Sequence, residues 1–211
     1  MTSTNPKNFL NAALLACLLA AGSGAARAQD IGRAVLLVAS PALTGPYEQT
    51  ALVVVPVEEK HIGFILNRTT GVKLSTLFPG HAPSATVADP VYLGGPEMND
   101  ALFAILRRDP GGQALQLFDD LFVTGRADAI NQNMEKTPNE ARYFAGFVGW
   151  MPGELEKEIE RGIWYVTKPD SGLVFSRDTS GMWLELVKRL GKGPRPLRGP
   201  GQLETRLDPG K

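Results

Sequence analysis

Hydrophobic positions in the first third of the chain stand in nearly continuous runs. Residues 33–40, 50–57 and 61–67 are apolar at most positions, which is typical of strands that are buried on both faces. Only the charged link 58–60 separates the second run from the third, so we expect these two strands to pair as a hairpin. We expect the first run to form a central strand of the sheet.

The rest of the chain alternates short apolar runs with stretches of helical spacing. Turns rich in Gly, Pro and Asp separate the short runs, which predicts a meander of strands at 91–93, 102–106, 115–118 and 121–124. Apolar residues recur at helical spacing in a short stretch, 72–78, and in three longer ones, namely 127–136, 153–161 and 182–190.

Residues 145–165 join a strand, a tight corner, a helix and a second strand. Pro152 suits a first helical turn and Gly162 suits a helix end. Leu155 and Ile159 are four residues apart and form one apolar stripe, while charged side chains occupy the rest of the helix. This pattern predicts a helix clamped between two strands.

The first 28 residues have the features of a secretory signal peptide in the expected order. Lys7 precedes an apolar run over residues 9–21, and Ala-Arg-Ala at 26–28 has the small-residue pattern of a signal-peptidase site. Cleavage would leave Gln29 as the first residue and a periplasmic or secreted protein, with no membrane span left after cleavage. An uncleaved membrane anchor is the alternative.

Composition and charge indicate one ordinary globular domain, over residues 29–190. The 211 residues are 43% hydrophobic and 21% charged. Removing Lys7 and Arg27 with the signal peptide lowers the 22 basic residues to 20, against 22 acidic ones. Nucleic-acid binding relies on a surplus of Lys and Arg, so this balance argues against a nucleic-acid partner. Five glycines and four prolines in residues 191–211 predict a disordered tail.

Metal and cofactor sites are not predicted. Cys17 lies in the signal peptide, so the mature chain would have no thiolate ligand, and His61 and His81 alone would leave a zinc ion to carboxylates. Glu154 and Glu158, four residues apart, could hold a hard cation, but a solvated helix face explains them as well. We expect no cofactor, no metal and no assembled catalytic set.

Four motifs in order resemble the YqgE/AlgH family of bacterial proteins, over residues 33 to about 191. The motifs are ASP at 39–41, GFILNR at 63–68, LGGP at 93–96 and GWMPGELEKEI at 149–159, followed by two tryptophans. The resemblance implies an α+β fold in which a bent, split antiparallel sheet forms a pseudo-barrel, with about three helices packed outside. Members of the family have no settled biochemical activity, and some have been described as candidate transcriptional regulators.

The chain departs from the family pattern at several positions. Arg107 stands where a histidine usually follows leucine, Glu154 replaces a glutamine, Glu97 replaces an apolar residue, and Tyr47 replaces a phenylalanine. A secretory signal is also not typical of the family, whose usual cytosolic location is therefore a further alternative.

Candidate ligand-binding residues gather in the family motifs and beside the predicted helix 153–161. Trp150 and Trp164 flank that helix and could floor a groove beside Asn67 and Arg68, although aromatic residues near a turn are more often core residues. Gly94-Gly95-Pro96 lacks the lysine and hydroxyl of a phosphate-binding loop, which favours a structural corner. The predicted set is Asn67, Arg68, Gly94, Gly95, Glu97, Trp150 and Glu154.

The sequence leaves three functions open. The first is a non-enzymatic module of the cell envelope that binds a protein, a peptide or a small ligand through this set. The second is a hydrolase that uses carboxylates such as Glu97, Glu154 and Glu158. The third is the regulatory role that the family resemblance implies.

Overall fold

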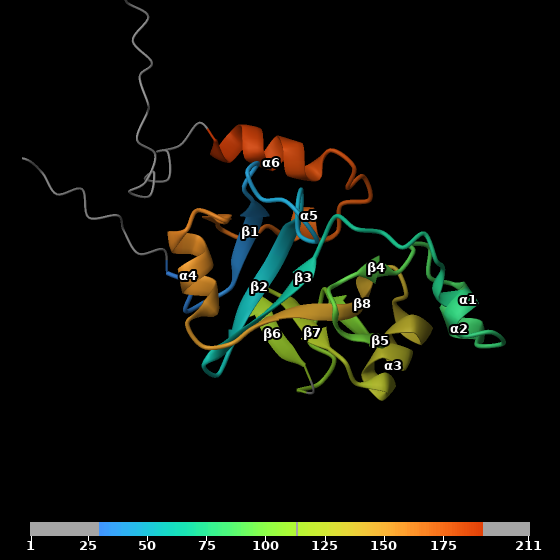
Figure 1. Cartoon of the computed structure of the whole chain (residues 1–211). Helices are drawn as coiled ribbons and strands as arrows, with labels where there is room; N and C mark the ends of the chain where they lie inside the picture. The colour runs from blue at the N-terminus through green and yellow to red at the C-terminus, as the bar shows by residue number, and fades with distance from the viewer. Residues whose placement is uncertain (1–29, 113, 192–211) are drawn as a thin grey trace, which may run out of the picture.

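The structure, a computed structural model, describes residues 30–112 and 114–191. Its strands form one nine-stranded sheet with the order β6-β7-β5-β8-β3-β2-β1-β9, and β4 pairs beside β8. The sheet curls into a half-barrel (Figure 1). The strands are β1 Val35–Ala39, β2 Ala51–Val57, β3 Lys60–Ile65, β4 Tyr92–Leu93, β5 Glu97–Leu106, β6 Leu115–Phe118, β7 Leu121–Thr124, β8 Ala141–Trp150 and β9 Trp164–Thr167.

Six helices form within the described residues, against about three expected. They are α1 Leu74–Leu77, α2 Ala82–Ala85, α3 Ala127–Lys136, α4 Glu154–Glu160, α5 Ser171–Val174 and α6 Met182–Leu190. The three longest and α1 were predicted, whereas α2 and α5 were not. Each of these two is a single turn that begins at a side-chain cap, His81 accepting from Ser84 N and Asp170 accepting from Gly172 N, and the sequence pattern of such a cap is that of a turn.

The α+β class and the bent, mostly antiparallel sheet are confirmed. The helices gather at different ends of the sheet, as Figure 1 shows: α4 lies beside β1 and β2, α6 runs above β1, and α1, α2 and α3 lie at the opposite end. Among the described strands, β4 and β8 form the single parallel pairing.

The predicted hairpin is present, and the predicted place of the first strand is wrong. β2 and β3 pair antiparallel from Leu52 opposite Ile65 to Val57 opposite Lys60. β1 lies between β2 and β9, one strand from the sheet edge. It is nevertheless buried on both faces, because alternate residues enter two different hydrophobic clusters, Leu36 in one and Leu37 in the other.

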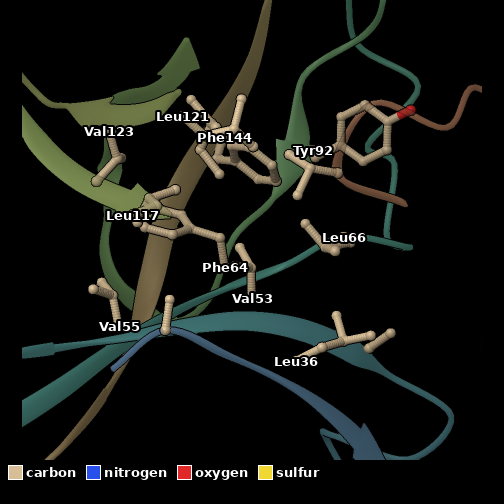
Figure 2. Packing of buried hydrophobic residues seen from close by; sticks show 14 of the residues in the cluster. Leu36, Val53, Val55, Phe64, Leu66, Tyr92, Leu117, Leu121, Val123 and Phe144 are labelled. Atoms are coloured by element: carbon tan, nitrogen blue, oxygen red, sulfur yellow. The ribbon is translucent and has the colours of Figure 1, made fainter. Parts of the chain in front are cut away.

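The largest hydrophobic cluster fills the inside of the curled sheet. Phe64 of β3 packs against Phe144 of β8 with ring centroids 5.4 Å apart, and Tyr92 of β4 lies 5.9 Å from Phe144. Figure 2 shows these rings facing side chains from β1, β2, β6 and β7, with the Tyr92 hydroxyl turned away at the edge of the cluster. A second cluster lies under α4, and a third lies between β5, β8, α1 and α3.

The predicted signal peptide, 1–28, and the predicted tail beyond residue 191 lie outside the described residues. Within residues 30–112 and 114–191, no helix is long and apolar enough to cross a membrane.

Candidate functional site

The corner around α4 is organised by one carboxylate that accepts two indole N–H groups. Trp150 at the end of β8 and Trp164 at the start of β9 are both buried, and their rings meet edge to face at 6.4 Å and 83°. Trp150 Nε1 and Trp164 Nε1 donate to Glu158 Oε2 over 2.9 and 2.7 Å. The apolar stripe of α4 points the same way, with Leu155 fully buried. The helix is therefore clamped to two strands by hydrogen bonds as well as by apolar contacts.

The side chain of Glu154 closes the turn in front of the same helix. Its Oε2 accepts from the backbone N of Met151 over 2.8 Å, and Gly153 just before the helix has a φ of +77°, which glycine adopts without strain. Glu154 and Glu158 therefore bind different partners within the fold. Among the described residues, no group of three or more histidine, cysteine or acidic side chains is placed to hold a metal ion.

Asn67 and Arg68 hold the loop between β1 and β2. The Asn67 side chain accepts from Ala51 N over 3.0 Å and donates to Gln49 O over 2.8 Å. The Arg68 guanidinium donates to Pro46 O and, over 3.1 Å, to Glu48 O. Both side chains thus replace backbone hydrogen bonds that this loop does not make for itself.

Gly94 and Gly95 directly follow β4, where the chain runs against the backbone of β8. A Cβ on Gly94 would overlap the carbonyl oxygen of Gly146, and a Cβ on Gly95 would overlap the backbone of Phe147. The backbone N of Gly94 donates to Ala145 O over 2.8 Å. The glycines therefore allow two backbones to touch, which accounts for the LGGP motif as a structural corner.

Glu97 is exposed, as Glu154 is, and it lies near Tyr47. Burial raises the pKa of the Tyr47 hydroxyl, the Glu97 and Glu158 carboxylates raise this pKa further, and Arg68 lowers it. The Tyr47 ring packs against Trp164 at 6.4 Å. The structure thus brings Arg68, Glu97 and the tryptophan pair to one corner with Tyr47 and Glu158, neither of which is in the predicted set.

A pocket of about 600 Å³ at the other end of the molecule was not predicted. It lies where α1, the segment after it, the middle of β5 and α3 meet. Two large apolar side chains at the pocket, Leu77 and Phe78, are 49% and 40% exposed. The residues that line the pocket are Leu77, Phe78, Pro79, His81, Ala101, Leu102, Gly125, Ala127, Ile130, Asn131 and Met134. We call this the α1–α3 pocket.

The polar side chains of the α1–α3 pocket form a short chain. His81 Nε2 lies 2.7 Å from Asn131 Oδ1, and Asn131 Nδ2 donates to Glu135 Oε1 over 2.7 Å. Ser84 N donates to His81 Nδ1 over 3.3 Å. Because Asn131 presents its oxygen and Ser84 its N–H, this network assigns the proton of a neutral His81 to Nε2.

Sequence reasoning treated both histidines as ordinary strand-end or loop residues, and the structure separates them. His61 on β3 is buried, with Nε2 3.1 Å from Ile31 O. His81 instead lines the α1–α3 pocket. Its partner Asn131 is 50 residues away in sequence, so no local pattern indicated the pair. The available signal was the apolar Leu77-Phe78 pair beside Pro79-Gly80, which a short helix cannot fully bury.

Comparison with known proteins identifies the family of this chain. Residues 36–195 match the family described as AlgH-like. The chain belongs to this family. Curated relatives include the UPF0301 protein of Chlorobium limicola, 30% identical over 162 residues that make up 74% of this chain and 85% of the relative. The UPF0301 protein of Streptomyces avermitilis is 33% identical over 163 residues, 73% of this chain and 84% of the relative.

Two solved structures share the fold of this AlgH-like chain. The solution structure of AlgH from Pseudomonas aeruginosa matches with a TM-score of 0.64 and 22% identity, over 77% of this chain and 90% of that protein. A crystal structure from Corynebacterium diphtheriae matches with a TM-score of 0.60 and 21% identity, over 75% of this chain and 86% of that protein. The family match and the curated relatives confirm the family resemblance of the motifs. At such sequence identities, the structural matches are evidence for the fold alone.

Proposed function

We propose that this AlgH-like chain is an exported, non-enzymatic binding module of the cell envelope, and that the α1–α3 pocket takes a small, largely apolar ligand. The observation that carries the proposal is the pocket itself. Its volume of about 600 Å³ falls within the range of about 300–1,000 Å³ that is typical of small-molecule sites. Its walls are mostly carbon, from residues such as Leu102, Ile130 and Met134.

Exposed apolar surface at the pocket favours binding over a purely structural role. Leu77 and Phe78 leave about half of their surface in water, although hydrophobic residues of this size are usually buried. A ligand that covered them would gain about 25 cal/mol for each Å² of apolar surface removed from water. This supports a ligand with a hydrocarbon or aromatic body.

The polar chain at the pocket favours a ligand with one polar end. His81 and Asn131 have partners already, which keeps both in a fixed orientation. A hydroxyl or carbonyl group of the ligand could share these donors and acceptors. Since both ring nitrogens of His81 are engaged, the ring is better suited to orienting a ligand than to removing a proton from it.

The engagement of the carboxylates also favours binding over hydrolysis. Glu154 is tied to the turn before α4, and Glu158 is tied to the two indoles. Glu97 is exposed, and no hydrogen bond of its carboxylate is found within the described part of the chain. The surface around Glu97 and Tyr47 remains a second candidate binding surface, because carboxylates and a half-buried phenol meet there beside Arg68.

A fluorescent probe titration tests the pocket. N-phenyl-1-naphthylamine, a neutral aromatic probe, should bind the chain saturably with increased emission. Ala101→Phe would place a ring in the pocket and should weaken binding at least about tenfold, or about 1.4 kcal/mol. The matched control, Ala42→Phe, adds the same ring at an exposed loop position and should leave binding unchanged.

The outcomes decide between the pocket, another surface and no binding. Equal loss in both variants, or no saturable signal from the parent chain, would refute the pocket as the site. Loss on Glu97→Ala with none on Ala101→Phe would move the site to the second surface. Export is tested separately by fractionation of a tagged chain. Recovery outside the cytoplasm with Gln29 as first residue is expected, and a cytosolic chain that keeps Met1 would rule export out.

A further inference from the structure

A fully buried arginine on β8 belongs to neither of the surfaces discussed above. The side chain of Arg142, the second residue of β8, has an exposed fraction of 0%. Its Nη2 donates to Ser176 O over 2.6 Å. Its Nε and Nη1 are buried and have no hydrogen-bond partner within the described residues. A buried guanidinium with two idle donor nitrogens is costly to a fold, since buried donors normally find acceptors.

Two further arginines converge on the same place from different parts of the chain. Arg107, just after β5, lies with its guanidinium carbon 3.8 Å from the centre of the Phe175 ring. Arg177, two residues beyond Phe175, approaches Asp89 with its Nε 3.4 Å from Oδ1. Arg142 Nη2 lies 3.8 Å from the other oxygen of Asp89, and its guanidinium carbon lies 4.2 Å from the Tyr92 ring centre.

The positive charge of this group is not balanced. Asp89 is the one carboxylate within salt-bridge distance of Arg142 and Arg177 among the described residues, and both separations exceed the roughly 2.7–2.9 Å of a strong charged hydrogen bond. Asp178 accepts instead from Ser180, and Glu140 pairs with Arg108. Arg142 and Arg177 therefore share one loosely held carboxylate, and Arg107 adds a third positive charge nearby without a salt bridge of its own among the described residues.

The surroundings of Arg142 also disfavour its positive charge. Burial lowers the pKa of the Arg142 guanidinium, and the charges of Arg107 and Arg177 lower it further, while Tyr92 and Asp89 oppose the change. An added negative charge at this point would offset both the burial and the repulsion.

We propose that Arg107, Arg142 and Arg177 form a binding site for a phosphate group. Arg107 and Arg177 are exposed and would contact the anion, which takes the place of Asp89 at Arg177. Arg142 lies beneath them and would stabilise the anion through its positive charge and through its unpaired Nε and Nη1. Phosphate fits better than a carboxylate because it offers more acceptor oxygens and more charge to three guanidinium groups, each of which presents its donors as a planar fork.

A titration with inorganic phosphate, monitored through the NMR amide signals of the full chain, tests the site. The Arg107 and Arg177 amides should shift saturably. Arg107→Gln and Arg177→Gln should each weaken binding at least about tenfold, whereas Arg108→Gln, which removes the same charge next to Arg107, should change affinity by less than about twofold. Arg142 is not varied, because its replacement could unfold the chain.

Asp89→Asn gives the sharpest distinction from a purely structural cluster. If the anion competes with Asp89, removal of that negative charge should tighten phosphate binding several-fold. If the arginines only pack the fold, Asp89→Asn would leave phosphate affinity unchanged. No saturable shift, or shifts that survive Arg107→Gln and Arg177→Gln together, would overturn the proposal.

The same variants identify the source of the phosphate. Cosedimentation with phosphatidylglycerol vesicles but not with phosphatidylcholine vesicles, lost in Arg107→Gln, would place the phosphate on an anionic lipid. Saturable binding of inorganic phosphate without cosedimentation would identify a free phosphate. Either result supports the site. Cosedimentation that Arg107→Gln and Arg177→Gln leave intact, with no phosphate shift, counts against it.

Discussion

Replacing Glu158 with leucine should destabilise the α4 corner, because it removes the shared acceptor of two buried indoles. Trp150 Nε1 and Trp164 Nε1 both donate to Glu158 Oε2. Leucine keeps the helix propensity and much of the side-chain volume, so the change is mainly one of hydrogen bonding. Both indole N–H groups would lose their partner.

The expected loss follows from the cost of an unpaired donor. A buried N–H left without an acceptor costs about 1–3 kcal/mol, so two such groups cost about 2–6 kcal/mol together. Glu158 is itself half-buried, and water can partly replace it, so we expect the lower end, about 2–3 kcal/mol. Glu158→Gln should cost only about 1 kcal/mol, because the amide oxygen can accept both bonds without the charge.

Urea unfolding followed by far-ultraviolet circular dichroism measures these changes. With a slope of about 2 kcal/mol/M, Glu158→Leu should lower the midpoint by about 1–1.5 M. Glu156→Leu, on the exposed face of the same helix, is the control and should stay within about 0.5 kcal/mol of the parent.

A double-mutant cycle isolates the hydrogen bonds from other effects of the leucine. Trp150→Phe with Trp164→Phe keeps two aromatic rings but removes both N–H donors. In that background Glu158→Leu should cost less than about 0.5 kcal/mol, a coupling of about 2 kcal/mol. If Glu158→Leu costs the same in both backgrounds, or no more than Glu156→Leu, the reasoning is refuted.

Two further predictions concern packing and pH. Gly94→Ala should destabilise the fold by about 3 kcal/mol or more in the same urea assay, because its Cβ would overlap the backbone of Gly146. Gly181→Ala is the control and should be nearly neutral, because nothing lies within 4 Å of the added Cβ. Equal effects of the two variants would contradict the close approach of β4 and β8. Burial raises the pKa of the Tyr143 hydroxyl above its usual 10.0, so above about pH 10 the unfolded chain loses this proton before the folded one and stability falls as pH rises. Tyr143→Phe should make this alkaline loss shallower in melting curves between pH 9 and about pH 11, and an unchanged slope would show that Tyr143 does not contribute to it.

Local sequence patterns determined the elements whose contacts lie close along the chain. The β2–β3 hairpin follows from two apolar runs and the short link at 58–60, and α4 follows from its apolar stripe and its flanking glycines. Gly162 does end that helix, with a φ of +71° and its N bound to Ile159 O. These features depend on backbone preferences and periodicity within about ten residues, which a single sequence displays directly.

Strand order and strand ends depended on pairing between distant segments. β5 begins at Glu97 rather than at residue 102, because Glu97 pairs with Phe147 across an irregularity in the ladder. The apolar run of β1 predicted a central strand, but β1 lies next to the sheet edge. Burial does not require a central place, because helices and loops can cover a strand as fully as neighbouring strands do. Apolar content reports burial, and it does not report which element provides that burial.

The candidate sites were decided by tertiary structure almost entirely. The sequence identified Trp150 and the glutamates of α4 as notable, but only the fold joins Glu158 to both indoles and leaves Glu154 to the preceding turn. The α1–α3 pocket joins His81 to Asn131, and the arginine group joins Arg142 to Ser176, across 50 and 34 residues of sequence. Such pairs carry no local periodicity, because they arise only when the curled sheet brings distant strands and loops to the same point.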